Sequence, residues 1–216
     1  MNLLDDLKYQ YKYGSAVIKL VFINVSIFVA IGFLNLFLLL FNTRFEFVNT
    51  YLALSGNFSH MLHTPWTLLT YQFTHTGFIH LLFNMVMLYF TGRIFEDFFR
   101  KQDIWRVYLL GGLAGGLLFM LSSFLPAFRN QHSILIGASG SIMAMLFATS
   151  GYAPNLRLAL FGVFEVRLIW LAVGYLVIDM ISIPSGNAGG HIAHIGGALF
   201  GYLFAKYRQG NLQINL

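Results

Sequence analysis

The sequence has no cysteine and few charged residues, and each absence restricts what the protein is. Without cysteine the chain forms no disulfide and has no thiolate for catalysis or metal binding. Asp, Glu, Lys and Arg make up only 10% of its 216 residues, whereas soluble proteins average about 25%. A water-soluble domain needs more polar surface than this composition supplies, so we predict an integral membrane protein.

Motifs of several other function classes are also missing. The sequence contains no dinucleotide-binding or phosphate-loop fingerprint, no His-Glu-x-x-His motif and no repeat of solenoid period. We therefore predict that the protein uses neither an organic cofactor nor a metal ion.

Hydrophobic residues make up 57% of the chain and gather in six long stretches. Each approaches the ~20 residues needed to cross a ~30 Å hydrocarbon core, although the fourth and fifth are short. The stretches are Ile18–Phe41, Thr76–Phe98, Ile104–Leu125, Ser133–Ser150, Leu168–Ile183 and Gly189–Tyr207. They predict an all-α membrane domain of six transmembrane helices at residues 18–207, between a cytoplasmic N-terminal segment at 1–17 and a cytoplasmic tail at 208–216.

The net charge of +5 reflects an uneven placement of basic residues. In a six-span chain that starts inside, only Arg44 and Arg129 of the 13 lysines and arginines lie on the outer side. This asymmetry follows the positive-inside rule and predicts that both termini are cytoplasmic, in a bacterial plasma membrane. The positive charge indicates attraction to anionic lipid headgroups rather than a nucleic-acid partner.

The longest predicted connection, Asn42–Thr74, lies on the outer side and is partly apolar. Connections of this length are usually functional. We expect it to form a half-buried structure, partly embedded in the outer membrane interface, with Trp66 and Tyr71 at the level of the lipid headgroups.

Ser139 and His194 stand out because each lies inside an apolar stretch, the fourth and the sixth. Ionisable residues at membrane depth are costly and rare, so each marks a candidate functional site. A serine hydroxyl needs a neighbouring base to act as a nucleophile, and His194 is the candidate base. Taken singly, each residue also fits a packing or hydrogen-bonding role between helices. His191, one turn earlier on the same helix face, is an alternative base.

His80 and Asn84 are four residues apart in the second stretch, so their side chains share a helix face. In the six-span topology they lie, with Ser139 and His194, roughly 6–12 Å below the outer surface. Imidazole and amide N–H groups in a dry site suit an oxyanion hole. Metal binding by His80, His191 and His194 is the alternative, although we see no carboxylate ligand beside them.

No carboxylate is obvious as a third catalytic member, although Asp179, near the outer end of the fifth stretch, lies at a depth that does not exclude the role. A carboxylate that snorkels to the surface, or one that makes a structural hydrogen bond, explains its position as well. The sequence leaves its role open, together with that of His191.

The segments HTGFIHLLFN, GASGSIMA and AHIGGALFG, in this order on the second, fourth and sixth stretches, resemble the rhomboid intramembrane serine proteases. The resemblance covers about Leu20 to Ala205. It implies that Ser139 is the nucleophile and His194 the general base of a dyad without a carboxylate. It also implies that the fourth helix begins below the membrane surface, under a water-filled cavity.

By the same resemblance, His80 and Asn84 stabilise the oxyanion together with the backbone N–H of Ser139. The implied partners are membrane lipids and single-span membrane proteins, which are cleaved near the outer interface. Two positions depart from the family: Thr67 follows Trp66 where an arginine is common, and Met143 stands where an aromatic residue often packs on the histidine.

Two other functions remain open at this point. One is a catalytically inactive rhomboid-like protein that binds membrane proteins, and the other is a small transporter. The first is disfavoured because serine and histidine are both present, and the second because no inverted repeat is visible. The oligomeric state and the natural substrate are not predicted.

Overall fold

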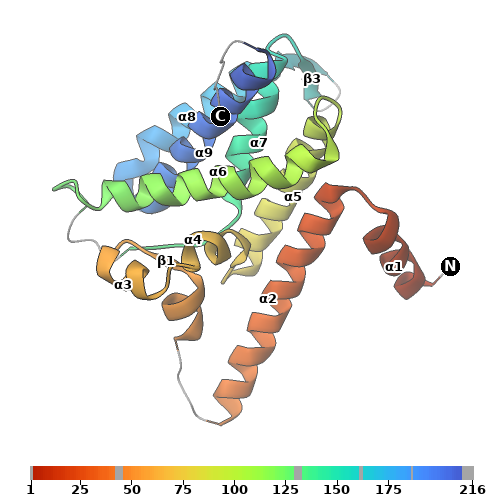
Figure 1. Ribbon diagram of the computed structural model, residues 1–216. Coiled ribbons are helices and arrows are strands. Elements are labelled where there is room, and N and C mark those ends of the chain that lie inside the picture. Colours follow the sequence, from red (N-terminus) through yellow and green to blue (C-terminus); the bar gives the residue numbers. More distant parts are fainter. Residues whose placement is uncertain (1, 42–45, 129–132, 161–162, 186, 211–216) are drawn as a thin grey trace.

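The computed structural model describes residues 2–41, 46–128, 133–160, 163–185 and 187–210 (Figure 1). These residues are mostly helical, with two small antiparallel ladders of two strands each. The predicted all-α class therefore holds for the bulk of the described chain, and the short strands are additions to it. Arg44 and Arg129, which we placed on the outer side, lie outside the described residues.

Six helices correspond to the six predicted stretches. They are α2 (Ala16–Leu40), α5 (Phe78–Glu96), α6 (Lys101–Ser122), α7 (Ser139–Tyr152), α8 (Leu168–Ser182) and α9 (Ala188–Arg208). Among the described helices, α2, α5 and α6 are long and apolar enough to cross a membrane, and α8 is a shorter apolar helix. These three helices support the membrane prediction, whereas the count of six spans stays a prediction.

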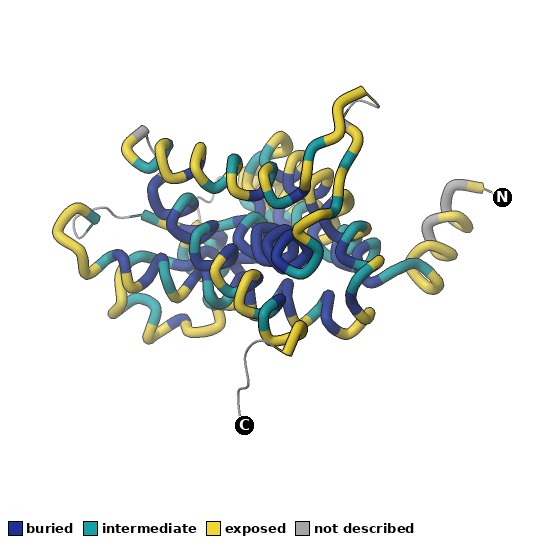
Figure 2. Tube along the Cα trace, turned by 90° about the horizontal axis from the view of Figure 1, so that it is seen from above, coloured by how far each residue is buried: buried dark blue, intermediate teal, exposed yellow. Residues whose placement is uncertain are grey.

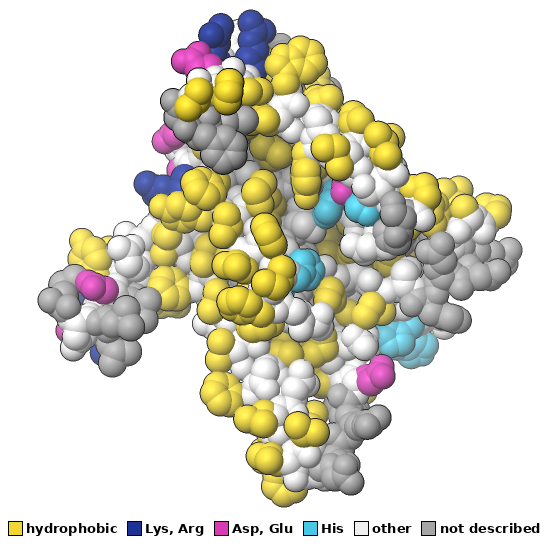
Figure 3. All heavy atoms as spheres, turned by 180° about the vertical axis from the view of Figure 1, so that it is seen from behind, with side chains coloured by type: hydrophobic (Ala, Val, Ile, Leu, Met, Phe, Trp, Pro, Cys, Tyr) yellow, Lys and Arg dark blue, Asp and Glu magenta, His cyan; other side chains and the backbone are white. Residues whose placement is uncertain are grey.

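Much of the surface of the bundle is apolar. Large side chains such as Phe33 and Phe37 on α2 and Phe83 and Phe90 on α5 are exposed. Figure 3 shows hydrophobic side chains over much of one face, with histidines visible between them. Exposed apolar patches of this extent are rare in soluble monomers and indicate contact with lipid or with another protein.

Helix α7 lies at the centre of the bundle and packs against α5, α6, α8 and α9. Every residue from Gly140 to Gly151 is buried, and buried residues gather at the centre in Figure 2. Helix α9 packs closely on α7 because glycines of α9 face α7. A Cβ at Gly197 would overlap the backbone oxygen of Gly140, and one at Gly201 would overlap that of Ala144. Main chain therefore meets main chain at this interface, as small residues permit between membrane helices.

The fourth stretch does not become helical at Ser133 as predicted. Strand β2 (Ile134–Leu135) pairs with β1 (Leu54–Ser55), and α7 begins only at Ser139. Gly137 separates the two elements with φ +112°, a conformation that glycine adopts at little cost. Ser139 is therefore the first residue of its helix rather than about six residues inside it, and the expected depth of Ser139 was derived from the wrong start.

The connection between α2 and α5 is folded where it is described. It contains η1 (Val48–Leu52), β1, α3 (Phe58–His63), α4 (Thr67–Thr70) and η2 (Tyr71–Phe73). Tyr71 is only 1% exposed, and its hydroxyl donates to the backbone oxygen of Gly112 at 2.5 Å. The hydrogen bond anchors Tyr71 inside the bundle, so its ring does not contact lipid headgroups, and its depth in the membrane stays a prediction. Trp66 is half-exposed and donates from Nε1 to the backbone oxygen of Tyr51 at 2.9 Å.

Four further elements lie outside the six main helices. Helix α1 (Leu3–Tyr13) precedes α2, and the short η3 (Ile183–Ser185) joins α8 to α9. The hairpin of β3 (Arg157–Leu160) and β4 (Phe164–Arg167) follows the C-terminal end of α7 and carries an exposed ion pair between Arg157 and Glu165. Ser139 and this basic hairpin therefore lie at opposite ends of α7.

Candidate active site

The four residues singled out from the sequence meet at one cavity. Helix α5 contributes His80 and Asn84, α7 contributes Ser139 and α9 contributes His194, and all four line a cavity of about 420 Å³. Tyr175 of α8 lines it as well. We call this space the site cavity.

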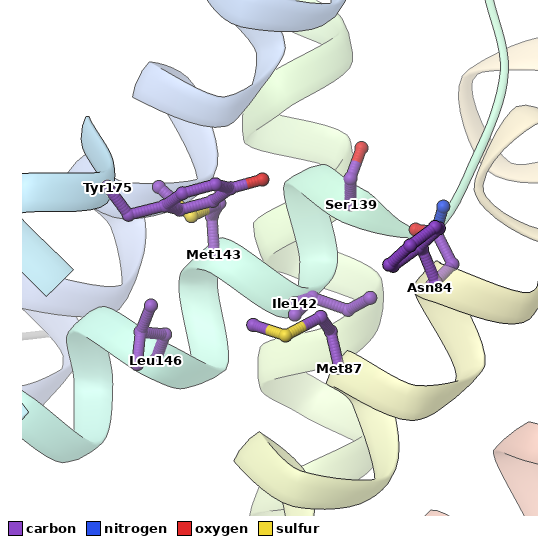
Figure 4. A pocket seen from close by; sticks show the side chains of 8 residues that line it. Asn84, Met87, Ser139, Ile142, Met143, Leu146 and Tyr175 are labelled. Atoms are coloured by element: carbon purple, nitrogen blue, oxygen red, sulfur yellow. The ribbon is translucent and has the colours of Figure 1, made fainter. Parts of the chain in front are cut away.

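A second, apolar pocket of about 80 Å³ adjoins the site cavity below Ser139. Its apolar lining comes from Phe83 and Met87 of α5 and from Ile142, Met143 and Leu146 of α7. Ser139, Asn84 and Tyr175 line both spaces. In Figure 4 the Ser139 side chain stands at the start of α7, with the side chains of Ile142 and Met87 lower in the view.

The turn before Ser139 is built around Gly137. Its N–H donates to the backbone oxygen of Tyr71 at 2.9 Å, which ties the start of α7 to η2. A Cβ at Gly137 would lie 2.8 Å from ring atoms of His80, so the imidazole occupies the space that a larger residue would fill. The absence of a side chain at Gly137 thus lets Ser139 and His80 approach the same cavity. Because Ser139 is the first helical residue, its N–H is among those without a partner in the preceding turn.

The polar groups beside Ser139 are incompletely paired. One N–H of the Asn84 amide donates to the backbone oxygen of His80 at 2.8 Å, which leaves its second N–H as a donor. Asn84 Oδ1 is buried without a hydrogen-bond partner among the described residues, and so are both ring nitrogens of His75. The rings of His75 and His80 are 5.1 Å apart between centroids. Buried polar groups in proteins are normally paired, so the unpaired ones suggest a binding function.

His194 is not isolated from acidic groups. Its Nδ1 lies 2.8 Å from Asp179 Oδ2, and His191 Nδ1 lies 2.5 Å from Asp179 Oδ1, both within hydrogen-bond distance. The statement that no carboxylate accompanies these histidines is therefore wrong. Ser139 Oγ makes no hydrogen bond to His194 in the described part of the chain. Hydrogen bonds between catalytic residues are often long or poorly aligned when no substrate is bound.

An aromatic ring does pack on His194, but it comes from another helix than the family pattern led us to expect. Tyr175 of α8 stacks on the imidazole with centroids 6.3 Å apart and an interplanar angle of 29°. Met143, at the position expected to be aromatic, is buried and lines the apolar pocket instead. We missed Tyr175 in the sequence, although its spacing of four residues from Asp179 places both on one face of α8.

Asp179, His191 and His194 offer three ligand atoms within 4.8 Å of one another, an arrangement that could hold a metal ion. The distances argue for hydrogen bonds instead. Two ligands of a tetrahedral zinc, each about 2.1 Å from the ion, lie about 3.4 Å apart. The Nδ1 to oxygen distances of 2.5 and 2.8 Å are shorter than this and are those of charge-assisted hydrogen bonds. That the protein needs no metal stays a prediction.

Comparison with known proteins supports the resemblance seen in the three motifs. The family model described as the Rhomboid domain matches residues 62–209, which is more than half of the chain and includes every residue of the site cavity. RHOMBOID-like protein 2 of Arabidopsis thaliana is 36% identical over 148 residues, which cover 65% of this chain and 41% of the relative.

Two other relatives are named as mitochondrial. RHOMBOID-like protein 12, mitochondrial, of Arabidopsis thaliana is 27% identical over 186 residues, covering 80% of this chain and 54% of the relative. Presenilin-associated rhomboid-like protein A, mitochondrial, of Danio rerio is 28% identical over 146 residues, which cover 63% of this chain and 36% of the relative. The chain thus spans about half the length of these relatives or less. They give no support to the predicted bacterial membrane.

The family match and the structure point the same way. The matched region contains α5, α7 and α9, and the three motifs that suggested the family lie where these helices meet the site cavity. The chain belongs to the rhomboid family.

Proposed function

We propose that the protein is an intramembrane serine protease that cleaves transmembrane protein substrates near the outer membrane interface. The observation that carries the proposal is the meeting of Ser139, His194, His80 and Asn84, from three helices, at one cavity. A nucleophile, a base and two N–H donors within one space are the groups that hydrolysis of a peptide bond requires.

The proposed reaction has two halves. Ser139 Oγ attacks the carbonyl carbon of the substrate while Nε2 of His194 takes the hydroxyl proton. His194 then gives this proton to the leaving nitrogen as the C–N bond breaks, which leaves an acyl ester on Ser139. A water molecule attacks the ester, His194 takes a proton from the water, and the proton returns to Oγ as the carboxylic acid leaves.

The oxyanion that forms in each half is negatively charged and needs donors that are already in place. The free N–H of Asn84, the imidazole of His80 and the backbone N–H of Ser139 border the site cavity and would supply them. Fixed donors in a dry site stabilise developing charge more than water does, because they need no reorganisation during the reaction.

The apolar pocket favours an uncharged side chain beside the scissile bond. Its lining of Met87, Ile142, Met143 and Leu146 suits an apolar group and excludes a charged one. The bond itself must also leave helical structure, because a transmembrane helix uses its carbonyls in its own hydrogen bonds. Substrates with small or helix-breaking residues near the membrane surface meet both conditions.

The topology that we propose has six spans, with Ser139 toward the outer side and the β3–β4 hairpin inside. The hairpin carries Arg157 and Arg167 at the end of α7 opposite Ser139, in agreement with the positive-inside rule. In this topology both termini are cytoplasmic.

Covalent labelling tests the proposal without knowledge of the natural substrate. The purified protein in detergent is treated with a fluorophosphonate probe, and the modified residue is mapped by mass spectrometry. We expect labelling at Ser139, its loss in Ser139→Ala and His194→Ala, and its retention in Ser141→Ala, a matched buried serine two residues along α7. A folded wild-type protein that takes up no probe and cleaves no transmembrane substrate would favour an inactive, protein-binding member of the family.

A further inference from the structure

One carboxylate, that of Asp179, is shared by two imidazoles beside the site cavity. Asp179 comes from α8, and both histidines come from α9, one turn apart. His191 Nδ1 lies 2.5 Å from one carboxylate oxygen and His194 Nδ1 lies 2.8 Å from the other, both within hydrogen-bond distance. Asp179 is 6% exposed, so the carboxylate is turned inward rather than extended to the surface.

The burial of Asp179 requires an explanation. An ionised carboxylate away from water is strongly unfavourable unless it is paired and hydrogen-bonded. A structural role would be met by either histidine alone, or by an uncharged pair of the same shape. The structure instead pairs Asp179 with a second histidine, His194, and this imidazole lines the site cavity beside Ser139.

We infer that Asp179 is a positioning residue for His194, so that the site works as a Ser139–His194–Asp179 triad in which His191 holds the second carboxylate oxygen. The inference rests on the proposed protease function. A neutral imidazole carries one N–H and one acceptor nitrogen. Because an ionised carboxylate only accepts, Asp179 keeps the proton of His194 on Nδ1, and Nε2 is left as the acceptor that a general base needs.

Helix α8 supplies both restraints on the His194 ring. Asp179 fixes the ring at Nδ1, and Tyr175, four residues earlier on the same face, stacks on its plane. Once His194 has taken the proton of Ser139, the carboxylate also stabilises the imidazolium, as in other serine hydrolases. His191 holds the other carboxylate oxygen, so the carboxylate group cannot rotate away from His194.

Turnover of a transmembrane substrate in liposomes tests this role. In Asp179→Asn the amide can also donate to the ring, so the imidazole adopts the wrong tautomer. We expect kcat to fall on the order of 10²-fold or more, with KM changed by less than about twofold. His191→Leu is expected to give a smaller fall in kcat, and His191→Gln, which keeps an N–H donor, to restore most of it.

The matched control is Asp103→Asn. Asp103 is the other buried carboxylate of the described helices and forms ion pairs with Arg106 and Arg208 at 3.3 and 3.4 Å. Arg208 is the last residue of α9, whereas His194 lies near the start of that helix. We expect this variant to unfold at a lower temperature with kcat unchanged. If the two Asn variants lose kcat equally, Asp179 is only structural and the inference is wrong.

A second readout does not depend on activity or on an Asp179 variant. Nitrogen NMR of histidine-labelled protein in the Ser139→Ala background reports which ring nitrogen of His194 carries the proton, with His191→Gln used for assignment. We expect the proton on Nδ1, and a proton on Nε2 would overturn the inference. Retained turnover in Ser139→Ala would instead refute the protease itself, while unchanged kcat in Asp179→Asn with an inactive Ser139→Ala would refute the triad alone.

Discussion

Two clusters of buried polar side chains lie in the same bundle, and they differ in whether their hydrogen bonds are complete. In the first, Asn24 of α2 donates to the Tyr108 hydroxyl at 3.1 Å, and that hydroxyl donates to the backbone oxygen of Gln72 at 3.0 Å. Ser141 of α7 donates to Gln72 Oε1 at 3.1 Å, so the network joins α2, η2, α6 and α7. At the site, by contrast, Asn84 Oδ1 on the cavity wall and the ring nitrogens of His75, which lies next to His80, are buried and unpaired among the described residues.

The comparison shows that a polar residue at membrane depth does not by itself mark a functional site. Both clusters are buried, and both tie separate helices together. A satisfied network rigidifies a core, whereas an unsatisfied one carries a free-energy penalty that persists when another function requires it. Missing hydrogen-bond partners therefore distinguish the candidate site from the structural network, whereas the presence of buried polar side chains does not.

The largest expected effect is the loss of activity in Ser139→Ala. Turnover of a transmembrane substrate should fall by about 10³-fold or more, because no other group at the cavity replaces the nucleophile. The melting temperature in detergent should change little, since Ser139 is the first residue of α7 and only partly buried. Full turnover in this variant would place the chemistry elsewhere.

His194→Ala should be as inactive as Ser139→Ala, because an unassisted serine hydroxyl is a poor nucleophile. The comparison with His191→Ala decides which histidine is the base. An inactive His191→Ala beside an active His194→Ala would reverse the assignment.

A smaller loss is expected for the proposed oxyanion donors. His80→Ala and Asn84→Ala should each lower kcat by about 10-fold to 10³-fold, with little change in KM, because the donors act on charge that develops only in the transition state. Steady-state kinetics separate the two parameters. A rise in KM at constant kcat would assign these side chains to substrate binding.

Tyr108→Phe tests the structural network, which we expect to contribute to stability and not to activity. The change removes the hydroxyl that links Asn24 to Gln72 and leaves both with a missing partner inside the core. We expect the unfolding free energy to fall by roughly 1–3 kcal/mol. Because the network does not border the site cavity, kcat of the folded fraction should equal that of the wild type.

We expect a chelator to have no effect on activity. The hydrogen-bond distances around Asp179 need no metal, so EDTA should leave kcat/KM unchanged. Loss of activity with EDTA, restored by zinc, would show that Asp179, His191 and His194 bind a metal instead of forming a triad.

Hydropathy predicted the helices well wherever a helix is apolar from end to end. The predicted stretch at Leu168–Ile183 agrees with α8 within one residue at either end, and that at Gly189–Tyr207 agrees with α9 equally well. The start of α7 was missed because residues 133–138 are as apolar as the helix they precede. Within them, Ile134 and Leu135 are extended because they pair with β1, a segment about 80 residues earlier, and hydropathy does not report such a contact.

The candidate site was predictable to the extent that its residues lie in recognisable motifs. Ser139, His194, His80 and Asn84 were all found in this way, and the structure brings them to one cavity. Tyr175 and Asp179 were not assigned, because their contact with His194 depends on how α8 is rotated about its own axis. That rotation is set by packing against α7 and α9, which no single-helix pattern contains.

The glycine contacts between α7 and α9 determine how the site responds to the surrounding lipid. Because Gly197 and Gly201 rest on the main chain of α7, these two helices cannot slide or rotate past each other without a clash. A bilayer thinner than the apolar span of the protein is accommodated by tilting of the helices. Here α7 and α9 must tilt as one body, which keeps Ser139 and His194 in the same relation while the surrounding helices adjust to the membrane.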